Sequence, residues 1–155
     1  MDDPTIRKCI NFAKGWGYGK MIMVNLFAYR STDPSLLIRD ENPVGPDNES
    51  YIPKCVSESN LVIACWGNHG KLLNRDKTLM DSLPNLVCLK RNKNGIPYHP
   101  LYLSKDITPM PYNSNRPIRM NPCRFFEVLI NIPNQISKRL QIKYSHALQQ
   151  NTHIS

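Results

Sequence analysis

Residues 60–71 read Asn-Leu-Val-Ile-Ala-Cys-Trp-Gly-Asn-His-Gly-Lys, and this stretch decides the fold. The apolar run 61–65 shows no alternation, so it predicts a strand that is covered on both faces, as in a parallel sheet. Trp66-Gly67 ends the strand, and Asn68 is expected to cap the helix that follows. A strand, a tight turn and a helix N-terminus together predict a ligand site at the carboxyl edge of an open α/β sheet.

The composition fits one domain with a core of its own and a charged partner. The chain has 155 residues, 41% of them hydrophobic, and 13 prolines, which imply many loops. It carries 20 Lys+Arg against 12 Asp+Glu, a net charge of +8. This charge suits nucleic acid or a nucleotide, although charge alone leaves a basic protein without such a partner equally open.

The cysteines are odd in number and widely spaced, with no Cys-x-x-Cys pair. They are Cys9, Cys55, Cys65, Cys88 and Cys123. We therefore expect reduced thiols, no metal site and no cofactor. The chain begins Met-Asp-Asp-Pro without a signal peptide, and no apolar run approaches the ~18 residues of a membrane span. These features predict a cytoplasmic protein with no membrane association.

A helix is expected to start at Asp3-Pro4, since Asp caps the free N–H groups and proline fits the first helical position. Its apolar stripe consists of Ile6, Cys9, Ile10 and Ala13. Glycines 15, 17 and 19 follow it. A dinucleotide-binding loop follows a strand and precedes a helix, whereas these glycines follow a helix and precede a strand. They therefore favour a helix-to-strand turn over a phosphate-binding loop.

The run 21–28 predicts a second buried strand, and Asn25 is its one polar residue. A structural interpretation is that the amide holds a neighbouring loop. A functional interpretation is that it lies at the sheet edge and reads a planar ligand with one donor and one acceptor. Spacing alone favours the structural interpretation.

Three further helices and a third strand are expected between residues 31 and 89. Asp33 is predicted to cap a short helix, and Asn48 a helix that ends near Glu58. The helix after Gly67 has Leu72, Leu73, Leu79, Met80 and Leu83 as its expected core face. Lys71, Arg75 and Lys77 on that helix either line a groove or form a solvated face. Residues 86–89 predict the third buried strand.

A basic turn at residues 90–95 follows that third strand, and His99 then lies between two prolines. A stiff backbone suits a side chain that positions a hydrogen bond, so we expect a functional role for His99 at the same sheet edge. The character of the chain changes after residue 106, where prolines interrupt a segment with little periodicity. Helices are predicted over 123–132 and 134–150, which divides the chain into an α/β domain, 1–106, and a Pro-rich segment with a helical tail, 107–155.

Seven motifs resemble, in the right order, the domain-of-unknown-function family 1643 (DUF1643). They are Asp2-Asp-Pro-Thr-Ile-Arg-Lys-Cys, Trp16-Gly-Tyr-Gly, Val24-Asn-Leu-Phe-Ala, Asp33-Pro, Asn42-Pro-Val-Gly-Pro, Ala64-Cys-Trp-Gly-Asn-His-Gly and His99-Pro-Leu-Tyr-Leu. The resemblance covers residues 2–106 and none of the tail. The family name conveys no biochemistry.

A more distant resemblance, to the uracil-DNA glycosylase superfamily, does imply a function. It rests on Asn25 after one strand, Trp66-Gly67 after the next and His99-Pro100 after the third. It implies that Asn25 reads the edge of a flipped base and that His99 stabilises the base oxygen. Leu101 replaces the serine with which the superfamily contacts phosphate. The net charge of +8 agrees with a clamp on a nucleic-acid backbone.

Both families place a strand before the first helix, and in glycosylases the loop after this strand holds the water-activating acid or its substitute. This chain begins at that point, with Asp2-Asp3-Pro4. We therefore expect a sheet that lacks an inner strand, whose backbone groups are paired by something else. We also expect base affinity with absent or very slow hydrolysis.

Together these patterns predict a three-layer α/β/α sandwich with a short parallel sheet, similar to uracil-DNA glycosylase, with a helical C-terminal extension. The expected function is recognition of a nucleobase in nucleic acid, with N-glycosidic hydrolysis open; the alternative is a non-catalytic nucleotide- or protein-binding module. The candidate catalytic residues are His99 and Asn25. The candidate substrate-binding residues are Asn25, Phe27, Trp66, Gly67, Asn68, His69, Pro100 and Leu101. The candidate contacts to a nucleic-acid backbone are Lys71, Arg75, Lys90, Arg91 and Lys93.

Overall fold

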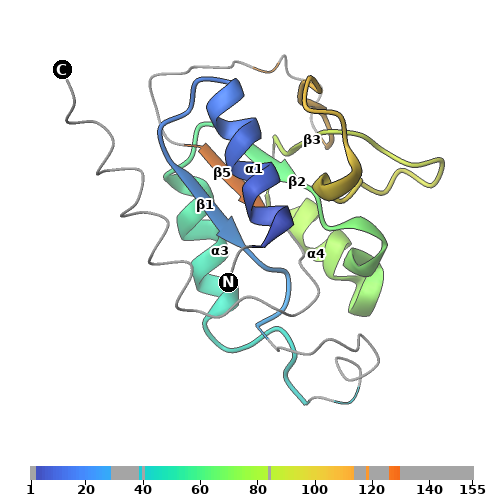
Figure 1. Cartoon of the computed structure of the whole chain (residues 1–155). Helices are drawn as coiled ribbons and strands as arrows, with labels where there is room; N and C mark the ends of the chain where they lie inside the picture. Colours follow the sequence, from blue (N-terminus) through green and yellow to red (C-terminus); the bar gives the residue numbers. More distant parts are fainter. Residues whose placement is uncertain are drawn as a thin grey trace.

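The computed structural model describes residues 3–28, 39, 41–83, 85–113 and 118, together with the backbone of residues 126–129. The described part belongs to the α/β class. In chain order its elements are α1 Pro4–Gly15, β1 Met21–Val24, α3 Asn48–Ser57, β2 Val62–Ala64, the 3₁₀ helix η1 Gly67–Asn74, α4 Arg75–Ser82, β3 Val87–Cys88, the 3₁₀ helix η2 Pro100–Tyr102, β4 Met110–Pro111 and β5 Phe126–Leu129 (Figure 1).

The strands form one five-stranded sheet in the order β1-β5-β2-β3-β4. The first four strands in this order are parallel, and β4 pairs antiparallel with β3 at the edge. Val24 of β1 and Ala64 of β2 both pair with Leu129 of β5, so these three strands end at the same level. The chain segments that leave β1 and β2 therefore emerge at the same level of the carboxyl edge of the sheet, with β5 between them.

Strand β5 comes from the C-terminal part of the chain and fills an inner position between β1 and β2 (Figure 1). The helix predicted over 123–132 is therefore wrong where β5 lies. A short apolar run fits a strand as well as a helix, and here two ladders of backbone hydrogen bonds decide for the strand. The expectation of a sheet without an inner strand is also wrong, because β5 pairs the facing edges of β1 and β2.

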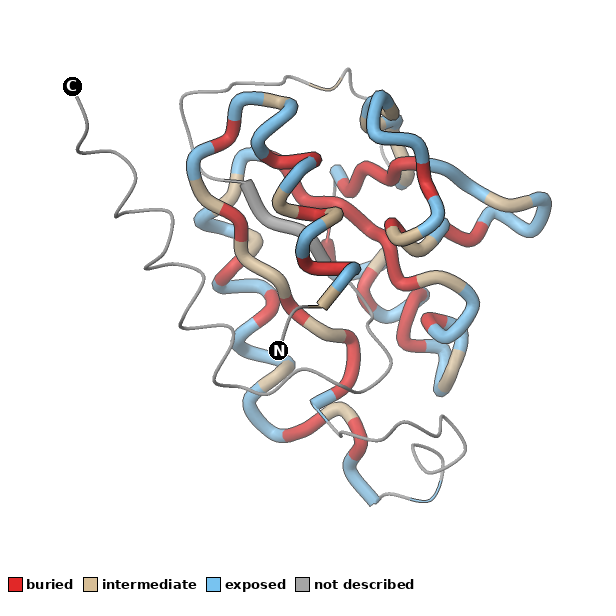
Figure 2. Tube along the Cα trace, viewed as in Figure 1, coloured by how far each residue is buried: buried red, intermediate tan, exposed pale blue. Residues whose placement is uncertain are grey.

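Two clusters of buried side chains lie on opposite faces of the sheet. Along β2 and its flanks, Ile63 and Cys65 belong to the cluster that includes Cys9 and Phe12 of α1. The intervening Ala64 and Trp66 belong to the cluster under α3 and α4. Figure 1 shows α1 over one face and α3 with α4 over the other, and Figure 2 shows buried segments concentrated along the strands. Because both faces of β2 are covered, its sequence is apolar without alternation.

The start of α1 confirms the capping prediction. Asp3 Oδ1 accepts the N–H groups of Thr5 and Ile6 at 2.7 and 3.2 Å, and Pro4 occupies the first turn. The glycine-rich segment after Gly15 turns the chain into β1, as expected, with Gly17 at φ +80°. A positive φ strains any side chain that has a Cβ, so this position favours glycine.

The other helix starts differ from the prediction. Asp47, and not Asn48, occupies the cap position of α3, and the Asn48 side chain bonds to the β1 exit instead. The segment after Gly67 forms η1, in which Leu72 and Leu73 leave helical geometry, before α4 begins at Arg75. This kink leaves the Leu73 side chain 52% exposed, so Leu73 is not part of the core face.

Two predicted helices fall on residues that the structure does not describe. They are the helix after Asp33 and the helix over 134–150. Within the described part, no helix is long and apolar enough to cross a membrane. Strands β4 and β5 come from the segment 107–155, so the sheet draws on both parts of the predicted division of the chain.

Candidate functional site

The candidate residues lie shortly after three strands that end at the same edge of the sheet. Asn25 directly follows β1, Trp66 and Gly67 follow β2, and the loop that ends at His99 follows β3. Since β5 lies between β1 and β2, two strand spacings, about 10 Å, separate Asn25 from the β2 exit. The edge therefore holds two groups of candidate residues, one at the β1 exit and one around His99.

Gly67 and His99 lie next to each other. The Gly67 N–H donates to the Pro97 carbonyl at 3.0 Å, which joins the β2 exit to the loop that carries His99. A Cβ added at Gly67 would lie 3.6 Å from the His99 Cβ, and Gly67 has φ +63°. A side chain at position 67 would thus be strained by the backbone conformation, although its Cβ would make only an ordinary van der Waals contact with the histidine.

The His99 ring has one engaged and one unengaged nitrogen. Nδ1 accepts the Leu101 N–H in a long hydrogen bond of 3.4 Å, which assigns the proton of the neutral ring to Nε2. Nε2 is buried and has no hydrogen-bond partner among the described residues. Burial lowers the pKa of His99 from its ordinary value of 6.5. At neutral pH the ring is therefore uncharged, and its Nε2–H is a buried donor without a partner among the described residues.

Two charged or ionisable side chains act on His99 from other elements. The Asp3 carboxylate at the start of α1 opposes the effect of burial on the His99 pKa, while His69 in η1 adds to it. Asp3 is an additional residue of this site that the sequence analysis did not select. Its capping role is visible in the sequence, but its proximity to His99 follows from the packing of α1 against η2.

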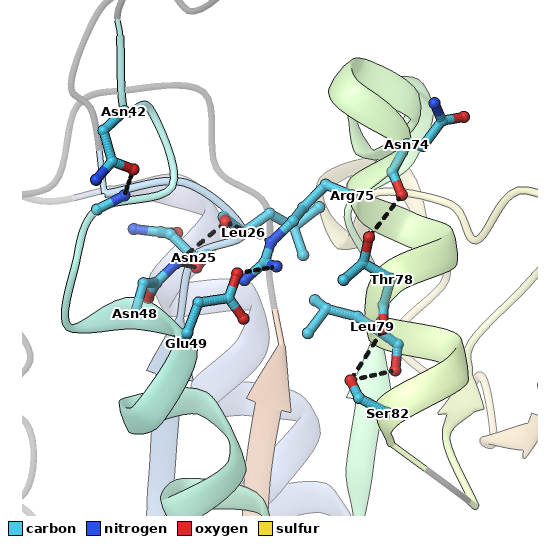
Figure 3. Close-up of polar contacts among 11 residues, drawn as sticks. Asn25, Leu26, Asn42, Asn48, Glu49, Asn74, Arg75, Thr78, Leu79 and Ser82 are labelled. Atoms are coloured by element: carbon cyan, nitrogen blue, oxygen red, sulfur yellow. Dashed lines mark hydrogen bonds and ion pairs between the residues drawn. The ribbon is translucent and has the colours of Figure 1, made fainter.

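The β1 exit is held by polar side chains from α3 and α4 (Figure 3). Asn48 Nδ2 donates to the carbonyls of Asn25 and Leu26 at 3.0 and 3.1 Å. Arg75 Nε donates to the Leu26 carbonyl at 3.2 Å, and its Nη1 pairs with Glu49 at 2.6 Å. The backbone that presents the half-buried Asn25 is therefore fixed from both helices.

Arg75 is buried, with 3% of its surface exposed, so the expectation that it contacts a nucleic-acid backbone is wrong. Its Nε and Nη1 bond to the β1 exit and to α3, and its buried Nη2 has no partner among the described residues, so the guanidinium serves structure. Lys71, Lys90, Arg91 and Lys93 are exposed, as a backbone contact requires.

Phe27 and Trp66 lie in the core and not at an open surface. They are 5% and 1% exposed and belong to the cluster under α3 and α4. The Trp66 ring makes an edge contact with Tyr112, with ring centroids 5.8 Å apart, and its Nε1 is buried without a partner among the described residues. Neither ring offers an exposed face to a ligand in this structure.

The remaining candidates surround His99 at different depths. Pro100 is buried and Leu101 is half-buried, while Asn68 and His69 are exposed. The side-chain Oδ1 of Asn68 accepts from Asn92 Nδ2 at 3.3 Å, which ties η1 to the basic turn. Asn68 therefore links two loops and does not cap a helix.

The described cysteines are buried thiols. Cys9, Cys55, Cys65 and Cys88 carry no disulfide, and Cys123 lies outside the described residues. Burial raises the pKa of Cys9 and Cys65 far above the ordinary value of 9, and that of Cys88 to about 11. Protonated, inaccessible thiols are poor nucleophiles. In the part of the chain that the structure describes, His, Cys, Asp and Glu form no group of three or more that could hold a metal ion.

One comparison with known proteins gives a match. The family model described as protein of unknown function (DUF1643) matches residues 1–101, which confirms the resemblance that the seven motifs indicate. No curated protein and no solved structure matches the chain.

Proposed function

We propose that this chain, which belongs to the DUF1643 family, recognises a nucleobase in nucleic acid, on a sandwich scaffold like that of the uracil-DNA glycosylase superfamily. The observation that carries the proposal is the neutral His99 ring, whose buried Nε2–H has no partner among the described residues. A buried donor without a partner costs about 1–3 kcal/mol. A ligand that supplies an acceptor, such as a base carbonyl oxygen, removes this cost.

The chemistry of a glycosidic bond fits this donor. Negative charge accumulates on the base as its bond to the sugar breaks, and a fixed N–H donor stabilises that charge. His99 takes this role in the proposal. Asn25, with one donor and one acceptor on its amide, takes the role of reading the base edge.

The sugar side of the reaction needs a water or a carboxylate. Asp3 is the carboxylate whose charge acts on His99, but its Oδ1 already accepts two N–H groups of α1. This engagement makes Asp3 a poor candidate for activating water. We therefore propose base binding with absent or very slow hydrolysis, in the cytoplasm, where the buried thiols remain reduced.

The test combines binding with an abasic-site assay on uracil-, hypoxanthine- and alkylated-base oligonucleotides. The His99→Ala variant is compared with Ser57→Ala, which removes an exposed polar side chain on α3. We expect His99→Ala to reduce the preference for one base about tenfold, as the loss of one buried hydrogen bond predicts. Equal binding by both variants would contradict the role of His99. Turnover by the unmodified chain that disappears in His99→Ala would instead show true glycosylase activity.

The burial of Phe27 and Trp66 favours a second candidate function, a non-catalytic module that binds a free nucleotide or a protein. A flipped base usually stacks on an aromatic or apolar face, and these two rings expose none. Calorimetric titration with free nucleotides at low and high salt separates the candidates. Salt-independent nucleotide binding, without affinity for oligonucleotides, would support the module.

A further inference from the structure

The loop after β3 forms a basic hairpin that projects from the body of the molecule (Figure 1). Arg91 pairs with Pro97 in an antiparallel bridge, and the Tyr98 N–H donates to the Lys90 carbonyl at 2.8 Å. Asn92 closes the turn, because its Oδ1 accepts the N–H groups of Asn94 and Ile96 at 2.9 Å each. The hairpin is thus held by its own hydrogen bonds while its tip remains exposed (Figure 2).

The charged side chains of the chain segment 82–105 have one sign, although the Asp3 carboxylate at the start of α1 lies near enough to act on His99. Between Asp81 and Asp106 the chain contains no Asp or Glu, while it contains Lys90, Arg91, Lys93 and Lys105, all exposed. A carboxylate neighbour would neutralise such cations, and none occurs along this segment. The surface therefore attracts a polyanion.

Two exposed tyrosines accompany these cations, one on each side of His99. Tyr102 ends η2 and is 86% exposed, and Tyr98 is 39% exposed at the base of the hairpin. The Lys90 Nζ lies 5.3 Å from the centre of the Tyr98 ring, so a cation and an aromatic ring lie next to each other on this surface. The Tyr102 ring has little packing role, because most of its surface is in water.

We propose that Tyr98 and Tyr102, with Lys90, Arg91 and Lys93, form a surface that binds single-stranded nucleic acid. The tyrosine rings stack on bases, and the cations contact the phosphates. Stacking on a side chain requires bases that are not enclosed in a duplex, so the surface favours single strands. This inference rests on the proposed function and names its substrate class: a strand bound here passes directly beside His99.

The test measures fluorescence anisotropy of labelled oligothymidylate and of a matched duplex, with the full chain, over a range of salt concentrations. Tyr102→Ala is expected to weaken single-strand binding about tenfold, and Tyr102→Phe to retain it. Tyr51→Ala is the matched control, because Tyr51 is a 40% exposed tyrosine on α3. Lys93→Gln is expected to reduce the salt dependence, whereas Lys54→Gln on α3 leaves it unchanged.

The outcomes separate this inference from the proposed function. Equal affinities of the Tyr102→Ala and Tyr51→Ala variants, tighter binding of the duplex, or no binding of a single strand would overturn the inference. If Tyr102→Ala weakens binding while His99→Ala does not change base preference, the strand-binding surface stands and the role of His99 as a donor to the base fails. If His99→Ala alone changes base preference, the proposed function stands without this surface.

Discussion

Arg75 and Glu49 join α4 to α3 through an ion pair of 2.6 Å, although the two side chains differ in environment. The Arg75 side chain is 3% exposed and the Glu49 side chain 61%. The guanidinium also donates to the Leu26 carbonyl, so one buried cation connects both helices with the loop that carries Asn25.

Because only Arg75 is buried, replacing Arg75 should lower the free energy of unfolding more than replacing Glu49. Arg75→Ala should lower the free energy of unfolding by about 2–4 kcal/mol, since packing and a buried hydrogen bond are lost. Glu49→Gln should cost only about 1 kcal/mol, because water partly replaces the exposed carboxylate. Urea unfolding measures both, with Lys77→Ala as an exposed control on α4. An equal cost for both variants would contradict the structural role of the buried cation.

Gly70 packs directly against the Trp66 ring, so a larger residue at position 70 should destabilise the fold. A Cβ at position 70 would collide with the Trp66 indole, which is buried. Gly70→Ala should therefore lower the free energy of unfolding by about 1–3 kcal/mol, as overpacking of a core does. Gly15→Ala is the control, because a Cβ there meets nothing within 4 Å. Thermal unfolding that ranks Gly70→Ala as stable as Gly15→Ala would contradict this placement of Trp66.

Strand β5 predicts that the C-terminal segment is needed for a folded sheet. Val128 pairs with Met23 on one side and Ile63 on the other. Val128→Pro removes a ladder donor in an inner strand and should cost about 3 kcal/mol or more. Val128→Thr keeps the N–H and serves as the control. Circular dichroism and urea unfolding compare the two, and a fully stable Val128→Pro variant would exclude β5 from the sheet.

His99 predicts a pH dependence of stability. Burial lowers its pKa in the folded chain, whereas the unfolded histidine takes up a proton near pH 6.5. The unfolded state therefore binds more protons as the pH falls below about 6.5, and the free energy of unfolding should decrease in that range. His99→Gln should reduce this dependence, and His69→Gln should retain most of it, because burial lowers the His99 pKa more than His69 does. Urea unfolding at pH 7.5 and at about pH 5.5 tests the sign.

The buried thiols predict a labelling pattern. In a Cys123→Ser variant, the four described cysteines should react with a thiol reagent only when the chain unfolds, since each is buried. Labelling in native buffer is compared with labelling in denaturant. Rapid reaction of a thiol in native buffer would contradict the packing of the element that carries it, which is α1 for Cys9, α3 for Cys55, the β2 exit for Cys65 and β3 for Cys88.

Sequence alone determined the elements whose causes lie within a few residues of the chain. Asp3 and Pro4 satisfy the start of α1 locally, and the unbroken apolar runs of β1, β2 and β3 identify strands that are covered on both faces. The order of the strand exits also predicted that His99 and Gly67 belong to one site, and in the structure Gly67 bonds to the loop that carries His99.

Tertiary structure alone decided the features whose partners are far apart in the chain. Residues 126–129 suit a helix or a strand by pattern, and only pairing with β1 and β2 makes them the inner strand. Arg75 has the sequence context of an exposed cation, yet it is buried, where it bonds to the Leu26 carbonyl and to Glu49. The influence of Asp3 on His99 likewise depends on how α1 packs. Local patterns specify an element and its buried face, but hydrogen-bond and charge partners depend on contacts that form only when the chain is folded.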